Sequence, residues 1–145
     1  MKPGFQIKAL SEIAIHTNNM AAMVPFYRDI LGLEPFATRA AGAIEFFRVG
    51  EGYDGLTAVV ALFDAGSDNQ IVTGRAGPSS SLHHIALAVS RTEQDAAESW
   101  FAQNGIATRI EEFSWVGWRG LFVTDPDGNT VELVARDSAL YDPRT

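Results

Sequence analysis

The chain has 145 residues, of which 46% are hydrophobic, with a net charge of −7 and no cysteine. This length and hydrophobic content predict one compact unit or two small fused ones, and they exclude a disordered chain. The acidic balance, with no cluster of Lys or Arg, argues against nucleic acid and anionic membranes as partners. Without cysteine there are no disulfides, thiolate metal sites or cysteine nucleophiles, so any metal would take nitrogen and oxygen ligands.

Targeting and membrane segments are not predicted either. No apolar run reaches the roughly 20 residues that a membrane helix needs. The start of the chain, Met1–Gly4, does not lead into the apolar stretch of a signal peptide. We therefore expect a cytoplasmic protein with no membrane partner.

The first half of the chain predicts a strand, a helix and further strands. A strand is expected over residues 7–17, and Asn18 or Asn19 then caps a helix that ends at Gly32. Pro25 predicts either a later helix start or a kink. Two more strands are expected over residues 44–49 and 57–63.

The second half follows a linker rich in Gly and Ser, residues 64–81, and repeats the same order. Ser90 and Glu93 form a capping box that starts a helix, and Gly105 ends it. Strands are expected over residues 84–89, 107–112, 121–124 and 130–135, with a tight turn at 125–129 before the last one.

An internal repeat relates the two halves. A shift of 72 positions (84 minus 12) places Glu12 on His84 and the sequence Ile-Ala-Ile on Ile-Ala-Leu. Each half then has the order β-α-β-β-β. Because half a chain of this length would be marginally stable alone, the halves are expected to share a core.

Strand periodicity places isolated polar residues on faces of small residues. Glu12 shares a face with Ala14 and His16, and His84 shares one with Ala86 and Ala88. Glu132 lies in the last strand, opposite Val131 and Leu133. The bulky aliphatic residues occupy the other faces, where helices should pack. This pattern predicts a pocket that presents His and Glu side chains.

Three segments carry a resemblance to a known family: FYRDILGL at residues 26–33, HIAL at 84–87, and DPDGN followed by Glu132 and Leu133. With the paired β-α-β-β-β order, the chain resembles the vicinal-oxygen-chelate superfamily. That family contains glyoxalase I, extradiol dioxygenases, and fosfomycin- and bleomycin-resistance proteins. The resemblance implies an α+β fold in which module one (residues 7–63) and module two (82–136), followed by a short tail (137–145), form a curled mixed sheet around a cleft. It also implies a homodimer.

The resemblance further implies a divalent metal ion, which could be Mn, Fe, Ni, Zn or Mg. Its ligands would be Glu12, His84 and Glu132, while the fourth family position falls on Ala61, which cannot bind a metal. Glu132 and Glu12 are also the candidates for catalytic proton transfer. Glu12 is either a metal ligand or a general base beside the substrate, and His16 could replace it as a ligand.

Four further residues are candidates for contacting a small-molecule substrate. His16 shares the face of Glu12, and Arg48 follows two phenylalanines. Trp118 and Arg119 could form an aromatic wall and an anion clamp, or could instead be packing and a solvated Arg.

These features predict a metal-dependent enzyme acting on a small molecule that chelates through adjacent oxygens. Glyoxalase-like lyase or isomerase chemistry and ring-cleaving dioxygenase chemistry both fit. The alternative is a metal-free small-molecule binding protein of the bleomycin-resistance kind, and a third option is a structural dimer with a vestigial site.

Overall fold

A computed structural model describes residues 6–68 and 82–145 of the chain. It divides the chain into two compact units, Met1–Ala76 and Gly77–Thr145, each of which contains one of the predicted modules. Most of the predicted linker lies outside the described residues.

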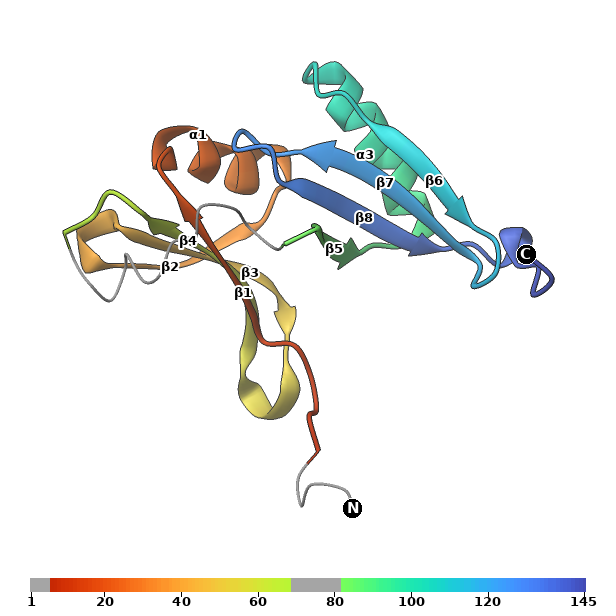
Figure 1. The fold of residues 1–145 in the computed structure, drawn as a ribbon, viewed down its shortest axis with the longest axis horizontal. Coiled ribbons are helices and arrows are strands. Elements are labelled where there is room, and N and C mark those ends of the chain that lie inside the picture. The colour runs from red at the N-terminus through yellow and green to blue at the C-terminus, as the bar shows by residue number, and fades with distance from the viewer. Residues whose placement is uncertain (1–5, 69–81) are drawn as a thin grey trace. The chain divides into compact units, whose positions relative to one another are not determined.

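Module one forms a four-stranded mixed sheet of order β1-β4-β3-β2 (Figure 1). β1 runs parallel to β4, and the other neighbours are antiparallel. Its elements are, in chain order, β1 (Glu12–Thr17), α1 (Met20–Pro25), the π-helical η1 (Phe26–Ile30), β2 (Glu34–Arg39), the short 3-10 turn η2 (Ala40–Gly42), β3 (Ile44–Glu51), the 3-10 turn η3 (Tyr53–Gly55) and β4 (Thr57–Asp64).

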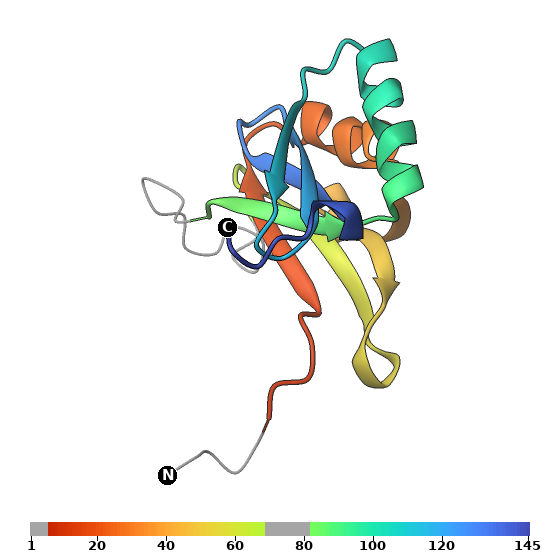
Figure 2. The same ribbon diagram turned by 90° about the vertical axis from the view of Figure 1, so that its right-hand side faces the viewer.

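Module two repeats this topology with the strand order β5-β8-β7-β6. β5 is parallel to β8, and α3 runs along one face of the sheet (Figure 2). Its elements are β5 (His84–Ala88), α3 (Arg91–Gln103), β6 (Arg109–Phe113), β7 (Trp118–Thr124) and β8 (Thr130–Arg136), followed by the 3-10 turn η4 (Ser138–Leu140).

The predicted α+β class and the paired β-α-β-β-β order are confirmed. Within residues 6–68 and 82–145, the strands form two four-stranded mixed sheets, one in each module. Among the described residues, no helix has both the length and the apolar character needed to cross a membrane.

Several element boundaries differ from the predictions. The first strand begins at Glu12 rather than at residue 7, and β2 was not predicted as a strand because its side chains are mostly exposed and lack a hydrophobic period. The first helix starts at Met20, before Pro25, and its α-helical part ends at Pro25, from which the chain continues directly into the π-helical turn η1. The strand predicted at residues 121–124 begins earlier, because residues 118–120 are the first residues of β7.

Helix caps explain where the helices begin. The Asn19 side chain accepts a hydrogen bond from the Ala22 amide, which starts α1. Ser90 and Glu93 form the predicted capping box at the start of α3, with each side chain bonded to the other residue's backbone amide.

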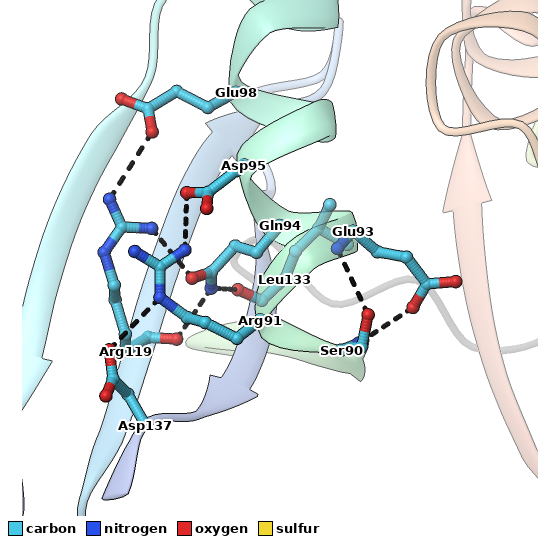
Figure 3. Close-up of polar contacts among 9 residues, drawn as sticks. All are labelled: Ser90, Arg91, Glu93, Gln94, Asp95, Glu98, Arg119, Leu133 and Asp137. Atoms are coloured by element: carbon cyan, nitrogen blue, oxygen red, sulfur yellow. Dashed lines mark hydrogen bonds and ion pairs between the residues drawn. The ribbon is translucent and has the colours of Figure 1, made fainter. Parts of the chain in front are cut away.

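A buried polar cluster fastens α3 to its sheet (Figure 3). The Gln94 amide nitrogen donates to the backbone carbonyls of Arg119 and Leu133, each at 2.7 Å. The Arg119 guanidinium donates in turn to the Gln94 carbonyl oxygen at 2.8 Å and pairs with Glu98 at 3.4 Å. Gln94 is fully buried. The cluster therefore joins α3 to both β7 and β8 through bonds that water cannot easily replace.

Candidate functional site

The centre of the candidate site in module two is a pair formed by His84 and Glu132. The two residues lie on neighbouring strands, where Glu132 pairs with Ala86 and His84 precedes Ala86 by two positions on the same face. The His84 Nε2 atom is 3.2 Å from the Glu132 Oε2 atom. Glu132 is only 6% exposed, whereas His84 is exposed. The structure thus brings together two of the three predicted metal ligands.

A missing side chain in β7 makes room for the Glu132 carboxylate. A Cβ atom added to Gly120 would stand 2.5 Å from Glu132 Oε1 and 2.6 Å from Cε2 of the Phe122 ring. Real Cβ atoms do not approach other atoms so closely. Gly120 is therefore the residue that lets the carboxylate and the Phe122 ring lie where they do. Sequence reasoning did not identify it, because the close approach exists only after β7 and β8 pair.

His84 has contacts on both of its ring nitrogens. Its Nδ1 atom lies 2.8 Å from Nδ1 of His83, with one ring donating and the other accepting. This leaves Nε2 directed at Glu132. His83 lies just before β5 begins, so the alternation of side chains along a strand does not apply to it. A partner on the second ring nitrogen is a common feature of metal-binding histidines, since it sets the tautomer and the ring orientation.

Aromatic side chains border the pair. The Phe122 ring meets the edge of His84 with ring centroids 6.2 Å apart. The guanidinium carbon of Arg109 lies 4.4 Å from the centroid of the Phe122 ring. Arg109 is also ion-paired with Glu111. The carboxylate of Glu132 is thus bordered by a hydrophobic ring as well as by His84.

The spacing of the pair suits two ligands of one metal ion. With ligand bonds of about 2.1 Å, neighbouring ligand atoms are about 3.0 Å apart in octahedral geometry and about 3.4 Å apart in tetrahedral geometry. The observed 3.2 Å falls between these values. Within residues 6–68 and 82–145, no cluster of three or more His, Asp or Glu side chains is close enough to hold a metal ion. The pair supplies two ligands, and any third would come from elsewhere.

Module one presents the equivalent face with different chemistry. Glu12 and Arg48 both flank Val59 in one cross-strand row, and Glu34 extends the row as the neighbour of Arg48. His16, Phe63 and Phe46 lie farther along this face. Phe63 meets the edges of His16 and Phe46 with centroid separations of 6.2 and 6.3 Å. The predicted site residues Glu12, His16 and Arg48 therefore share one face of the module one sheet.

Strand register identifies the residue of module one that corresponds to Glu132. Ala61 pairs with Ala14 in module one, as Glu132 pairs with Ala86 in module two. Glu12 likewise corresponds to His84. The family position predicted to fall on Ala61 is thus the structural counterpart of Glu132, and Ala61 is fully buried.

Trp118 and Arg119, predicted to act together, lie on opposite faces of β7. Trp118 shares the face of Gly120 and Glu132 and is 47% exposed. Arg119 is 8% exposed and points to α3, where Gln94 and Glu98 bind it. Successive residues of a strand alternate in direction, so one substrate cannot contact both side chains on a single face.

Comparisons with known proteins bear on the family and the fold of the chain. The model of the Glyoxalase/Bleomycin resistance protein/Dioxygenase superfamily matches residues 9–133. No match was found among curated proteins.

Solved structures of similar fold include three of named type. A glyoxalase/dioxygenase from Nostoc punctiforme has a TM-score of 0.68 at 22% identity, covering 95% of this chain and 97% of its own. Lactoylglutathione lyase from Agrobacterium tumefaciens has a TM-score of 0.66 at 23% identity, covering 89% and 94%. The fosfomycin resistance protein FosX from Listeria monocytogenes has a TM-score of 0.65 at 18% identity, covering 93% and 97%. At these identities the likeness concerns the fold alone.

Proposed function

The chain belongs to the Glyoxalase/Bleomycin resistance protein/Dioxygenase superfamily, and from this premise we propose that it is a metal-dependent enzyme. Its substrate would be a small molecule that chelates through adjacent oxygens. The reaction would be of the lyase or isomerase type, or a ring-cleaving dioxygenation. The observation that carries the proposal is the 3.2 Å approach of His84 Nε2 to the buried carboxylate of Glu132.

Two side chains of module two would hold the ion, and one of module one would complete the set. His84 would bind through Nε2 and Glu132 through Oε2, and we propose Glu12 as the third ligand. One imidazole and two carboxylates nearly neutralise a divalent ion and favour hard or borderline metals, with Mn, Fe, Ni, Zn and Mg as candidates. When bound, such an ion would supply Lewis acidity at the two chelated substrate oxygens.

The remaining residues of the two faces would bind substrate and move protons. Arg48 lies in the same row as Glu12, so its guanidinium would bind an anionic group of a substrate whose reacting carbon lies near Glu12. Glu12 is exposed, which leaves its carboxylate able to exchange a proton with substrate if it is not held as a ligand. His16 and the Phe63 ring would line the same face and exclude water.

Metal content tests the proposal. The full chain would be analysed by plasma mass spectrometry beside a variant carrying His84→Ala and Glu132→Gln. We expect near-stoichiometric metal in the wild type and loss in the variant. A His16→Ala variant is the matched control, since it removes an imidazole of module one and should retain the metal. Glu12→Gln separates the roles of Glu12: loss of metal indicates a ligand, and retained metal with lost turnover indicates a base.

The second candidate function is a metal-free binding protein of the bleomycin-resistance kind. Ala61 favours it, because a side chain without donor atoms stands at the position equivalent to Glu132. The aromatic group of His16, Phe63 and Phe46 is the kind of surface that would hold an apolar ligand. A wild type that contains no metal, even after reconstitution with each candidate ion, would sink the metalloenzyme and leave this function.

We also propose that the chain assembles as a homodimer, as the family resemblance implies. Light scattering on the full chain should then give twice the 15.7 kDa mass of one chain. A mass of one chain at all concentrations would contradict the dimer but would leave the proposed metal site untested by that result.

A further inference from the structure

A hollow of about 230 Å³ lies at the far end of the second unit's sheet from the His84–Glu132 pair. Its lining combines aromatic rings, one cation and small residues. The lining residues are Val116, Gly117, Trp118, Arg136, Ser138 and Tyr141.

The walls of the hollow are held by backbone bonds of the C-terminal segment. After β8 ends, the Asp137 amide donates to the Gly117 carbonyl at 2.8 Å, and the Asp142 amide donates to the Ser114 carbonyl at 2.8 Å. The segment thereby lies across the turn that joins β6 and β7. Gly117 has a φ of +72°, and a Cβ there would stand 3.1 Å from Cβ of Tyr141. A larger residue at position 117 would therefore crowd Tyr141 and would be strained at this positive φ.

The Asp137 carboxylate adds a second anchor. One of its oxygens accepts from the Ala139 amide at 3.1 Å, and the other accepts from Arg91 Nε at 3.2 Å (Figure 3). Arg91 belongs to α3, so the segment that carries Tyr141 is tied both to the β6–β7 turn and to the helix. A hollow with walls fixed in this way is formed before any ligand arrives, which lowers the entropy cost of binding.

Arg136 gives the hollow a positive charge that no ion pair among the described residues neutralises. Within residues 6–68 and 82–145, five arginines form ion pairs with Asp or Glu, and Arg136 is not one of them. The six lining residues include no carboxylate. In a chain with a net charge of −7, a cation left without a carboxylate beside a hollow is a candidate to bind an anion.

Two aromatic side chains stand beside this cation. Trp118 and Arg136 are cross-strand partners on β7 and β8 and share a face. Trp118 is 47% and Tyr141 56% exposed, so both rings leave area for a ligand. A volume of about 230 Å³ is below the usual 300–1,000 Å³ of drug-sized sites and suits a single ring with one substituent.

From these observations we infer that the hollow is a binding site for a small aromatic carboxylate. The carboxylate pairs with the Arg136 guanidinium, and the ring lies against Trp118 and Tyr141. Arg136 follows Glu132 by four residues on β8, which is about 13 Å along a strand. A single-ring ligand cannot span that distance, so this site is separate from the proposed metal site and does not depend on it.

Benzoate is the probe that tests the site, with acetate and benzamide as comparisons that lack the ring or the charge. The full chain would be titrated while the backbone amide signals of Trp118, Arg136 and Tyr141 are followed by NMR. We expect benzoate to shift these signals, and acetate and benzamide to bind about tenfold more weakly or worse.

Three variants decide where benzoate binds. Arg136→Gln should weaken binding about tenfold or more, since it removes a charge-assisted bond. Tyr141→Ala should also weaken it, and it keeps the Cβ atom that packs against Gly117, so the fold of the segment is preserved. Arg39→Gln, at an exposed arginine of module one, is the matched control and should bind as the wild type does.

The proposed function and this site fail in different ways. The His84→Ala, Glu132→Gln variant should lose metal yet bind benzoate normally. Loss of benzoate binding in that variant would overturn the inference, because it would place the ligand at the metal site. Absence of binding to the wild type would overturn it too, as would unchanged binding in both Arg136→Gln and Tyr141→Ala.

Discussion

The two modules have the same strand order and register. At two equivalent positions, however, the large and the small side chain are exchanged between the modules. In module two the large residue is Glu132 on β8, whose cross-strand partner on β7 is Phe122. Gly120, two positions from Phe122 on the same face, leaves room for the Glu132 carboxylate. In module one the equivalent positions are Ala61 on β4 and Ile44 on β3. The buried carboxylate of Glu132 thus lies where the neighbouring strand has a glycine in place of a larger side chain. The comparison shows that the site depends on a matched pair of positions and not on the carboxylate alone.

The helices differ in the same manner. Gln94 and Met23 both occupy the fourth position after the helix cap, and both are fully buried. Met23 meets an apolar core, whereas Gln94 binds two strand carbonyls and Arg119. Those carbonyls belong to the residues next to Gly120 and Glu132. The buried polar cluster therefore lies on the side of the sheet opposite the Glu132 carboxylate. Module one has no carboxylate at the equivalent position, and Met23 makes no such hydrogen bonds there.

Converting module one toward module two should have the largest effect. Ala61→Glu buries a carboxylate where Ile44 fills the space that Gly120 leaves open, and the residue equivalent to His84 is the acidic Glu12. We expect a loss of about 3–5 kcal/mol in the free energy of unfolding, because the charge has no partner. Urea denaturation measures this loss.

The control for this change is Ala14→Glu, in the same cross-strand row but exposed. It should alter stability by less than about 1 kcal/mol. An Ala61→Glu variant as stable as this control would show that module one can hold a carboxylate, and the comparison of volumes would fail.

Replacing Gln94 with the residue type found at the equivalent position of module one should have the second-largest effect on stability. Gln94→Met keeps the size of the side chain but leaves two carbonyls and part of the Arg119 guanidinium without their partner. We expect a loss of about 2–4 kcal/mol in the free energy of unfolding, measured by urea denaturation. Met23→Leu is the matched control and should cost less than about 1.5 kcal/mol. Equal losses in the two variants would mean that the polar cluster contributes no more than ordinary packing.

Gly120→Ala should cost less stability but should change the site. The new Cβ would collide with Glu132 and Phe122, and both side chains must move. We expect a loss of about 1–3 kcal/mol in the free energy of unfolding, together with a reduced metal content by mass spectrometry. Gly50→Ala is the control, since nothing lies within 4 Å of a Cβ at that position. If Gly120→Ala binds as much metal as the wild type, the position of the Glu132 carboxylate next to Gly120 is not required for metal binding.

The smallest effect concerns the helix caps. Hydrogen bonds with the Ser90 backbone and side chain lower the pKa of Glu93. Because the folded pKa is lowered, the stability that this bond contributes is present above the ordinary pKa of Glu and is lost as pH falls through the lowered value. Ser90→Ala should reduce the free energy of unfolding by about 1 kcal/mol. It should raise the Glu93 pKa only part of the way toward its ordinary value, because the backbone amide of residue 90 still donates to Glu93.

Carbon-detected NMR titration of Glu93 and urea denaturation give these two quantities. Asn19→Ala is the counterpart in module one, where the third helical residue is Ala22 and no reciprocal carboxylate exists. A Glu93 pKa that does not change in Ser90→Ala would exclude the Ser90 hydroxyl as a cause of the lowered value.

Strand periodicity was a good guide to the faces of the sheets. It placed His84 and Glu132 on strands whose small neighbours share their faces, and the pairing of Ala86 with Glu132 brings the two together. It was a poor guide where the period is absent. β2 is mostly exposed on both faces, so its residues show no alternation of polar and apolar side chains.

Arg119 shows a second limit of the sequence. Its place beside Trp118 in the sequence suggested an anion clamp. In the structure the Arg119 side chain points at α3, where it donates a hydrogen bond to Gln94 and pairs with Glu98. The sequence alone does not distinguish a buried structural Arg from a substrate-binding one. Only the partners that the fold supplies distinguish them.

The sequence by itself determined the order of elements, the internal repeat, the helix caps and the residues that carry the candidate chemistry. These are local properties, set by periodicity and by residues a few positions apart. The tertiary structure decided that Gly120 makes room for Glu132, that His83 meets His84, and that Arg136 lines a hollow together with Trp118 and Tyr141. Each of these contacts forms only after strands pair or the chain folds back on itself. Residue spacing in the sequence does not specify such contacts.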